Sequence, residues 1–129
     1  MTPHILIVDD EPSVRTLIWR FLIKHNYQVT TAATAAEAEA LIGELPVDLA
    51  LIDLVLPDGD GLALMRRIKN RQPHLPILIM SGIGFDEMLV KEAQDKGADG
   101  YVSKALPLGQ LLKDIRRIFK QTEPKARSS

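Results

Sequence analysis

Short apolar runs alternate with amphipathic segments along the whole chain. Three of the runs are apolar on both sides of any pleat, which is typical of strands buried on both faces of a parallel sheet. The run at 29–32 is weaker, as expected of an edge strand. The predicted strands are His4–Val8, Val29–Ala32, Asp48–Asp53, Ile77–Met80 and Tyr101–Ser103.

Between these runs, apolar residues recur at intervals of three and four, which predicts helices with one buried face. In the first helix the predicted core stripe is Val14, Leu17, Ile18, Phe21 and Leu22, and it leaves Trp19 and Ile23 on the opposite side. Thr34 and Glu37 form a capping box at the start of the second helix. The first three predicted helices are Ser13–His25, Ala35–Gly43 and Gly61–Arg71. A fourth helix is indicated by Phe85, Met88, Leu89 and Ala93 and ends at Gly97. A fifth begins at Pro107, and its apolar stripe is Leu108, Leu111, Leu112, Ile115, Ile118 and Phe119.

Five strands that alternate with five helices predict an α/β fold: a doubly wound five-stranded parallel sheet with helices on both faces. We expect the first strand in the sheet interior and the 29–32 strand at an edge. Residues 1–120 form one predicted domain, and the polar stretch 121–129 is predicted to be a tail or the start of a linker.

The composition adds few constraints. The chain has 129 residues, 46% of them hydrophobic, and a net charge of −1. A nearly neutral protein does not attract nucleic acid by its net charge, so we expect no direct nucleic-acid binding by this domain. It has no cysteine, which excludes disulfides and thiolate metal sites. No apolar run is long enough to span a membrane and no signal pattern is visible, so we expect a cytoplasmic protein without a membrane partner.

Charged and polar residues stand where the predicted strands end. Parallel strands present their carboxyl ends at one edge of the sheet, where open α/β folds keep their ligand sites. The residues expected to meet there are Asp9, Asp10, Asp53, Ser81 and Lys104. Converging carboxylates repel one another unless a cation or protons intervene, and a hard divalent ion such as Mg²⁺ is the simple remedy.

Such a site suits phosphoryl transfer to a carboxylate. Asp53 is the best nucleophile, because it projects from the central strand between the acidic pair and Lys104. Mg²⁺ and the Lys104 ammonium would neutralise the transferred oxygens, and Ser81 could donate a hydrogen bond to one of them.

Four segments in order, ILIVDDEPSVR, LALIDLVLPDGDGL, LIMSG and GADGYVSK, resemble the receiver domain of two-component response regulators over roughly residues 3–120. The resemblance implies the flavodoxin-like strand order 2-1-3-4-5 and phosphorylation of Asp53. It implies Mg²⁺ ligation by Asp10, Asp53 and the backbone carbonyl of Val55, with Asp9 acting mainly through metal-bound water. It also implies that Ser81 and Tyr101 form a switch pair and that Lys104 contacts the phosphoryl group.

The same resemblance implies the partners. A sensor histidine kinase or a histidine phosphotransfer protein would supply the phosphoryl group. The domain would then switch a surface formed by the fourth helix, the last strand and the fifth helix, and this surface could pair two copies of the chain. It would not be an enzyme, beyond assisting its own phosphorylation and dephosphorylation.

Three alternatives compete. Phosphatases with an aspartate nucleophile place a second carboxylate two residues later, where this chain has Val55, which cannot transfer a proton. A flavodoxin-like cofactor binder would bring its phosphate against Asp9, Asp10 and Glu11, which repel it. A degenerate receiver that acts unphosphorylated as an interaction module stays open as the alternative, although all the site residues are present.

Some positions depart from the family pattern, and the three histidines do not form a predicted metal site. Lys104 is followed by Ala105, where the family has proline with a cis bond, so we expect a trans bond. The resemblance also implies that Val55 and Ile83 flank the path of the attacking water; since neither side chain can orient water, we expect slow hydrolysis of the phosphoaspartate. His4, His25 and His74 lack paired ligand spacing, and we expect them to be solvated.

Overall fold

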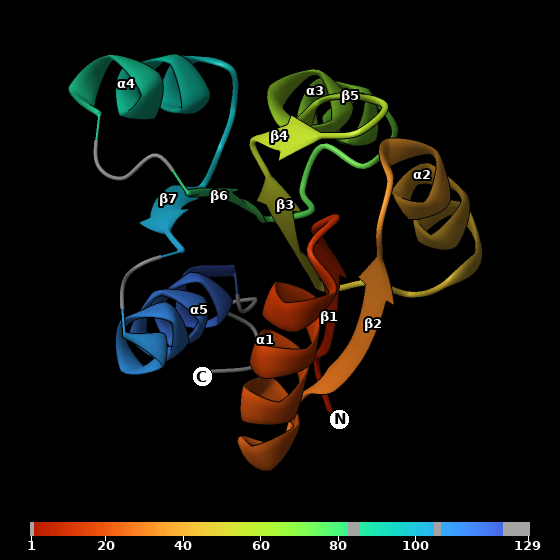
Figure 1. Ribbon diagram of the computed structural model, residues 1–129, viewed down its shortest axis with the longest axis vertical. Helices are drawn as coiled ribbons and strands as arrows, with labels where there is room; N and C mark the ends of the chain where they lie inside the picture. The colour runs from red at the N-terminus through yellow and green to blue at the C-terminus, as the bar shows by residue number, and fades with distance from the viewer. Residues whose placement is uncertain (1, 83–85, 105–106, 123–129) are drawn as a thin grey trace.

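The computed structural model describes residues 2–82, 86–104 and 107–122. Five parallel strands form the central sheet, in the order β2-β1-β3-β6-β7 (Figure 1). This is the predicted flavodoxin-like order. The strands are β1 (His4–Val8), β2 (Gln28–Ala32), β3 (Leu49–Asp53), β6 (Ile77–Ser81) and β7 (Gly100–Ser103). The helices are α1 (Pro12–Lys24), α2 (Ala35–Glu44), α3 (Gly61–Arg71), α4 (Glu87–Asp95) and α5 (Leu108–Thr122).

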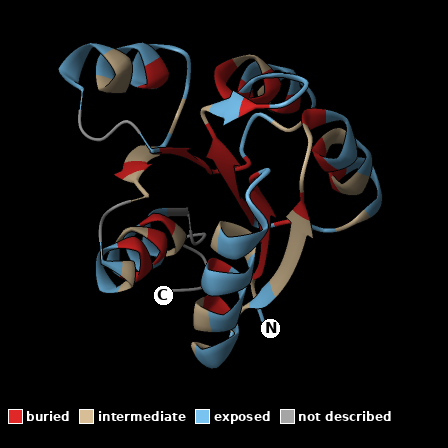
Figure 2. Cartoon of the chain, in the orientation of Figure 1, coloured by how far each residue is buried: buried red, intermediate tan, exposed pale blue. Residues whose placement is uncertain are grey.

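Helices cover both faces of the sheet (Figure 1). Alternate side chains of a strand point to opposite faces, so Ile5 and Ile7 of β1 pack with α1 and α5, while Leu6 and Val8 pack with α2 and α3. Every residue of β1, β3 and β6 is buried, whereas β2 is mostly half-buried at its edge (Figure 2). The predicted central and edge strands are therefore confirmed.

The predicted capping box is present with one change: the Glu37 carboxylate reaches Ala33, one residue before the N-cap Thr34. The Thr34 hydroxyl accepts a hydrogen bond from the Glu37 N–H at 3.1 Å, and the Glu37 carboxylate accepts one from Ala33 at 2.8 Å. These two contacts satisfy amide groups that the start of α2 would otherwise leave without partners.

Four details differ from the sequence prediction. Leu17 is 57% exposed, so the core stripe of α1 is narrower than the periodicity suggested. Met88 is 83% exposed and does not mark a buried face of α4. His4 is buried rather than solvated, with its ring Nε2 2.7 Å from the Thr30 hydroxyl. Helix α5 continues to Thr122, two residues into the stretch predicted as a tail.

A small antiparallel hairpin was not predicted. It joins β4 (Val55–Leu56) to β5 (Gly59–Asp60) between β3 and α3. The proposed helix residue Phe85, the Lys104–Ala105 bond, Ile83 and the end of the predicted tail at 123–129 lie outside the described residues. Among the helices that are described, none combines the length and apolarity that crossing a bilayer would require.

Candidate functional site

Four strands of the sheet deliver the predicted site residues to one edge. Asp9 directly follows β1, Asp53 ends β3, Ser81 ends β6 and Lys104 follows β7. The Asp9, Asp53 and Ser81 residues are 0, 5 and 1% exposed. Burying two carboxylates this deeply is costly unless cations or hydrogen bonds compensate.

The compensation comes from Lys104. Its ammonium nitrogen lies 2.8 Å from Asp9 Oδ2, 2.8 Å from Asp53 Oδ2 and 2.9 Å from Glu11 Oε1. One cation thus joins three acids that come from two different strand ends. Sequence analysis identified Lys104, Asp9 and Asp53, but it did not identify Glu11 as a partner of the lysine.

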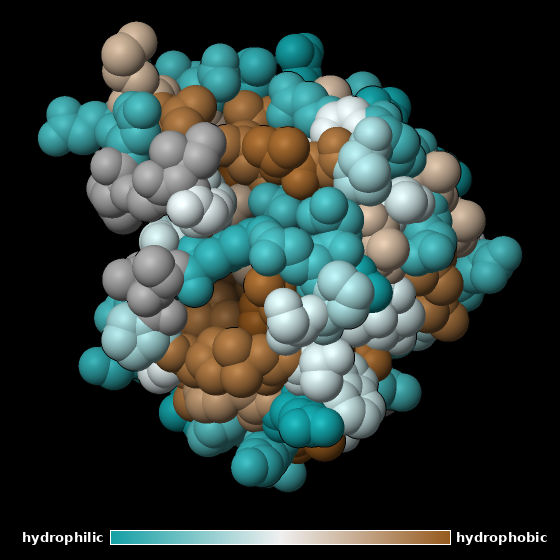
Figure 3. Space-filling view, viewed as in Figure 1, coloured by the Kyte–Doolittle hydropathy of each residue, from teal (hydrophilic) through white to brown (hydrophobic). Residues whose placement is uncertain are grey.

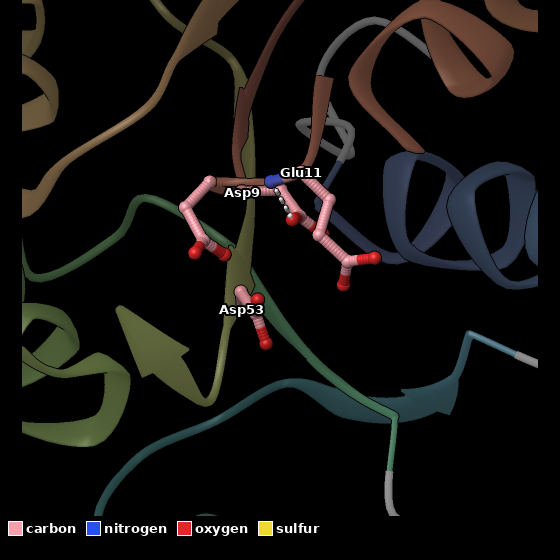
Figure 4. Close-up of side chains that lie close together, drawn as sticks. Asp9, Glu11 and Asp53 are labelled. Carbon is pink, nitrogen blue, oxygen red and sulfur yellow. Dashed lines mark hydrogen bonds between the residues drawn. The ribbon is translucent and has the colours of Figure 1, made fainter. Parts of the chain in front are cut away.

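The segment after β1 is held by its own backbone contacts. Asp9 Oδ1 accepts a hydrogen bond from the Glu11 N–H at 2.9 Å, which Figure 4 shows as a dashed line. The Arg15 guanidinium donates to the Asp9 carbonyl at 2.7 Å. Figure 4 shows the carboxylates of Asp9 and Glu11 above that of Asp53, at the ends of neighbouring strands.

The segment after β3 is equally restrained. The Val55 N–H donates to Asp53 Oδ1 at 3.3 Å, and the Gly61 N–H donates to the Leu54 carbonyl at 2.8 Å. A Cβ atom at Gly61 would lie 2.1 Å from the Asp53 carbonyl oxygen, so only glycine permits this approach. The start of α3 is therefore packed directly against the backbone of Asp53.

Charge and burial oppose each other in this site. Burial raises the pKa of Asp53 above its ordinary 3.8, the hydrogen bond from Lys104 opposes that rise, and the charge of Asp9 adds to it. Burial alone would lower the pKa of Lys104, but hydrogen bonds to Asp53, Asp9 and Glu11 raise it above its ordinary value. Lys104 therefore stays an ammonium ion at neutral pH.

The carboxylates fit a hard divalent cation. Asp9, Asp10, Glu11 and Asp53 each offer one oxygen, and these atoms lie within 4.8 Å of one another. Oxygen ligands from two or three carboxylates suit Mg²⁺, which keeps several waters. Asp10 and Glu11 are exposed, so the acidic cluster opens to solvent on one side.

The other two predicted residues lie beside this cluster. Ser81 pairs with Ser103 in the ladder between β6 and β7, and its carbonyl accepts a hydrogen bond from the Lys104 N–H at 2.9 Å. Tyr101 is half-buried in β7, two residues further from the strand end than Ser103. Both lie on the side of the site that faces α4.

An acid held beside an ammonium ion at the end of a central strand can act as a nucleophile toward phosphorus. Asp53 ends β3, the middle strand of the sheet, contacts Lys104 and accepts a backbone hydrogen bond. Asp9 shares the last two features but follows the neighbouring strand β1. The fixed positive charge next to it would stabilise the negative oxygens of a transferred phosphoryl group.

Comparisons with known proteins show the family of the chain. A family model for the response regulator receiver domain matches residues 5–116. Protein PetR of Rhodobacter capsulatus is 34% identical over 119 residues, which cover 92% of this chain and 49% of that protein. The DNA-binding dual master transcriptional regulator RpaA of Synechocystis is 30% identical over 123 residues, 94% of this chain and 51% of that protein.

Solved structures have the same fold. A CheY-like response regulator receiver domain protein from Methanospirillum hungatei matches with a TM-score of 0.88 and 29% identity, over 95% of this chain and 97% of that one. NtrX from Brucella abortus matches with a TM-score of 0.90 and 30% identity, over 99% of this chain and 29% of that one. The chain spans about half the length of the two curated relatives described above.

Proposed function

The chain belongs to the response regulator receiver family, and we propose that it is a phosphorylation switch in which Asp53 accepts the phosphoryl group. The observation that carries this proposal is the position of the Lys104 ammonium, 2.8 Å from both Asp53 and Asp9 at the carboxyl edge of the sheet. A carboxylate held against a fixed cation is prepared for a transferred group that brings more negative charge.

A phosphohistidine on a sensor histidine kinase or a histidine phosphotransfer protein is the proposed donor. In the transfer, the bond from phosphorus to the imidazole nitrogen breaks and a bond from phosphorus to an Asp53 carboxylate oxygen forms. The electron pair of the broken bond stays on the imidazole. Lys104 remains charged throughout and contacts the new phosphoryl oxygens.

The acidic cluster is the proposed Mg²⁺ site. Asp10, Asp53 and the Val55 backbone carbonyl would hold the ion, and Asp9 would act mainly through its bound water. When bound, Mg²⁺ supplies positive charge to the phosphoryl oxygens. Lys104 pairs with Asp53 and Asp9 in this structure, so it neutralises one acid that would bind the ion directly and one that would act through its bound water.

The proposed output is a change at the α4–β7–α5 surface. Added charge at the strand ends would draw Ser81 and Lys104 toward the phosphoryl group, and Tyr101 would take a second position with α4. This surface is also the proposed contact between two copies of the chain. The domain itself is proposed to be neither an enzyme nor a nucleic-acid binder, and to act in the cytoplasm.

The test uses acetyl phosphate, a small donor that needs no docking partner. With Mg²⁺, the wild type is expected to gain the mass of one phosphoryl group. Asp53→Asn and the wild type with Mg²⁺ removed by a chelator are expected to gain none. No mass gain in the wild type would favour the degenerate, unphosphorylated receiver, and full labelling of Asp53→Asn would show that another residue is the nucleophile.

The proposed docking surface for the phosphodonor partner is the exposed face of α1. Trp19 and Ile23 are 41 and 42% exposed, as the helical wheel predicted. Leu17 is also exposed, but it lies on the other flank of α1, toward α5. Figure 3 shows an apolar hollow beside this helix. Its lining residues come from α1, α5 and the strand ends: Val14, Leu17, Ile18, Met80, Val102, Ser103, Lys104, Leu108 and Leu111.

Replacing both Trp19 and Ile23 by alanine tests this surface. Transfer from the cognate partner is expected to fall, chiefly through weaker binding, while labelling by acetyl phosphate stays normal. Equal loss with both donors would place the pair in the structural core instead, and no loss with either would mean that the partner docks elsewhere.

A further inference from the structure

The tip of the β4–β5 hairpin is fastened to a distant helix. The two carboxylate oxygens of Asp58 accept hydrogen bonds from the N–H groups of Ala35 at 2.8 Å and Ala36 at 3.1 Å. These are the first two residues of α2, 23 and 22 positions away in the chain. The hairpin follows the phosphoacceptor strand, so this contact links the site to α2.

Helix α2 does not need this contact for its own cap. Thr34 and Glu37 already form the capping box. Asp58 adds two further bonds to amide groups that the box leaves available. The two N–H donors lower the pKa of Asp58, so its carboxylate is charged at neutral pH.

The hairpin, by contrast, has few other restraints. Its ladder consists of two residue pairs, Val55 with Asp60 and Leu56 with Gly59. A hairpin of that length is marginal by itself in water. Leu56 is buried, but the Val55 side chain is 64% exposed and contributes little packing. The tip therefore depends on Asp58 for its position.

Val55 is where this position matters for the site. Its N–H donates to Asp53 Oδ1 at 3.3 Å, which is longer than the 2.8 Å contact between Lys104 and the same carboxylate. A hairpin that could swing would carry the Val55 backbone away from Asp53. The Gly61 contact fixes the backbone at Leu54, so Val55 is the first residue that a swinging hairpin would move.

We propose that Asp58 is a positioning residue for the phosphoacceptor site. By tying the hairpin to the start of α2, it holds the Val55 backbone beside Asp53 and so preserves the shape of the divalent-cation site. The inference rests on the proposed function, because it assumes that Asp53 and Val55 take part in binding Mg²⁺.

The experiment compares Asp58→Ala with Thr34→Ala. Both variants remove a side-chain acceptor from the start of the same helix, but among the described residues the Thr34 hydroxyl bonds Glu37 and not the hairpin. Mg²⁺ affinity is measured by titration calorimetry without any phosphodonor, and exchange of the Val55 amide proton is followed in parallel. We expect Asp58→Ala to weaken Mg²⁺ binding about tenfold and to speed exchange at Val55, as loss of a supporting contact does at other metal sites.

Thr34→Ala is expected to keep Mg²⁺ affinity within about twofold of the wild type, because the hairpin stays anchored. Asp58→Asn keeps one acceptor oxygen and the side-chain shape, so it should recover part of the affinity, and it replaces the alanine variant if that variant does not fold. The proposal is overturned if Asp58→Ala, or Asp58→Asn in its place, binds Mg²⁺ like the wild type. It is also overturned if Thr34→Ala loses as much affinity.

The outcome for the wild type separates this inference from the proposed function. A wild type that binds Mg²⁺ and is labelled, together with unchanged Asp58 variants, removes the positioning role alone. If the wild type binds Mg²⁺ but is not labelled, the phosphoacceptor function is overturned, and the Mg²⁺ affinities of the variants still decide the role of Asp58. A wild type that binds no Mg²⁺ overturns both.

Discussion

Helices α3 and α4 cover the same face of the sheet, yet they are attached to it very differently. Helix α3 contributes a row of residues to the core: Gly61, Leu62, Leu64, Met65 and Ile68. Across residues 87–95, α4 contributes Ala93, and its Met88 is 83% exposed. Figure 2 shows the contrast as red on α3 and mostly pale blue on α4.

The difference separates two tasks at one edge of the sheet. The α3 side carries Asp53 and its hairpin, and dense packing keeps this proposed nucleophile in place. The α4 side adjoins Ser81 and Tyr101, where few buried contacts oppose movement. A surface that switches between two arrangements needs such a weakly held element, because the two states must differ by only a few kcal/mol.

One methionine in each helix gives the most direct test. Met65 is fully buried in α3, so Met65→Ala is expected to destabilise the fold by about 3 kcal/mol through lost burial and a cavity. Met88→Ala in α4 is expected to change stability by less than about 0.5 kcal/mol. Urea unfolding of both variants measures the two values, and similar losses would contradict the contrast between the helices.

The second test concerns the contact between α3 and the site. Gly61→Ala places a Cβ against the Asp53 carbonyl and should cost about 2 kcal/mol, because backbone must move to make room. Labelling of Asp53 by acetyl phosphate should slow in the same variant, since the displaced backbone belongs to the proposed nucleophile.

Gly109→Ala in α5 is the matched control. A Cβ there meets nothing within 4 Å, so alanine should be neutral or stabilise the helix by about 0.5 kcal/mol. Normal stability and labelling in Gly61→Ala would show that the start of α3 adjusts freely and is not a rigid support.

The smallest expected effect is the pH dependence of the stability that Asp58 contributes on the α3 side of the sheet. The N–H groups of Ala35 and Ala36 lower the pKa of Asp58 below its ordinary 3.8. A carboxylate whose pKa falls on folding stabilises the protein above its unfolded pKa and loses that effect as the pH drops through the folded value. The difference in Tm between wild type and Asp58→Ala should therefore be largest near about pH 6 and shrink below pH 3.8.

Thr34→Ala serves again as the control, because threonine does not titrate. Its difference in Tm from the wild type should stay constant over the same pH range. If the difference in Tm from the wild type depended on pH in the same way for both variants, its cause would be the start of α2 in general and not the carboxylate of Asp58.

The fold could be predicted largely because its strands have strong local patterns. Runs such as Ile5–Val8 and Leu49–Ile52 are apolar on both faces, and parallel strands then place their last residues together. The acidic cluster and Lys104 followed from that placement alone. Their proximity in the structure agrees with the prediction, while the roles of the individual residues stay proposals.

What the sequence did not predict depends on contacts between distant residues. The β4–β5 strands have two residues each, too few to show an alternating pattern. Asp58 and Glu11 look like ordinary surface acids until Ala35 and Lys104 come beside them. Leu17 fits the helical stripe of α1, yet the sheet and α5 cover only the side that holds Ile18 and Leu22.

Lys104 contacts residues that are far from it in the sequence, and this separation has a consequence during translation. Lys104 lies 51 positions after Asp53 and 93 after Glu11, so its cation is the last part of the cluster to be synthesised. At about 5–20 residues per second, roughly 3–10 s separate the translation of the nucleophile from that of its lysine. A nascent chain in that interval has the acids without their counter-charge, and β7 has not yet closed the sheet. Only a finished domain therefore presents Lys104 together with the acids, the arrangement that the proposed phosphoryl donor would meet.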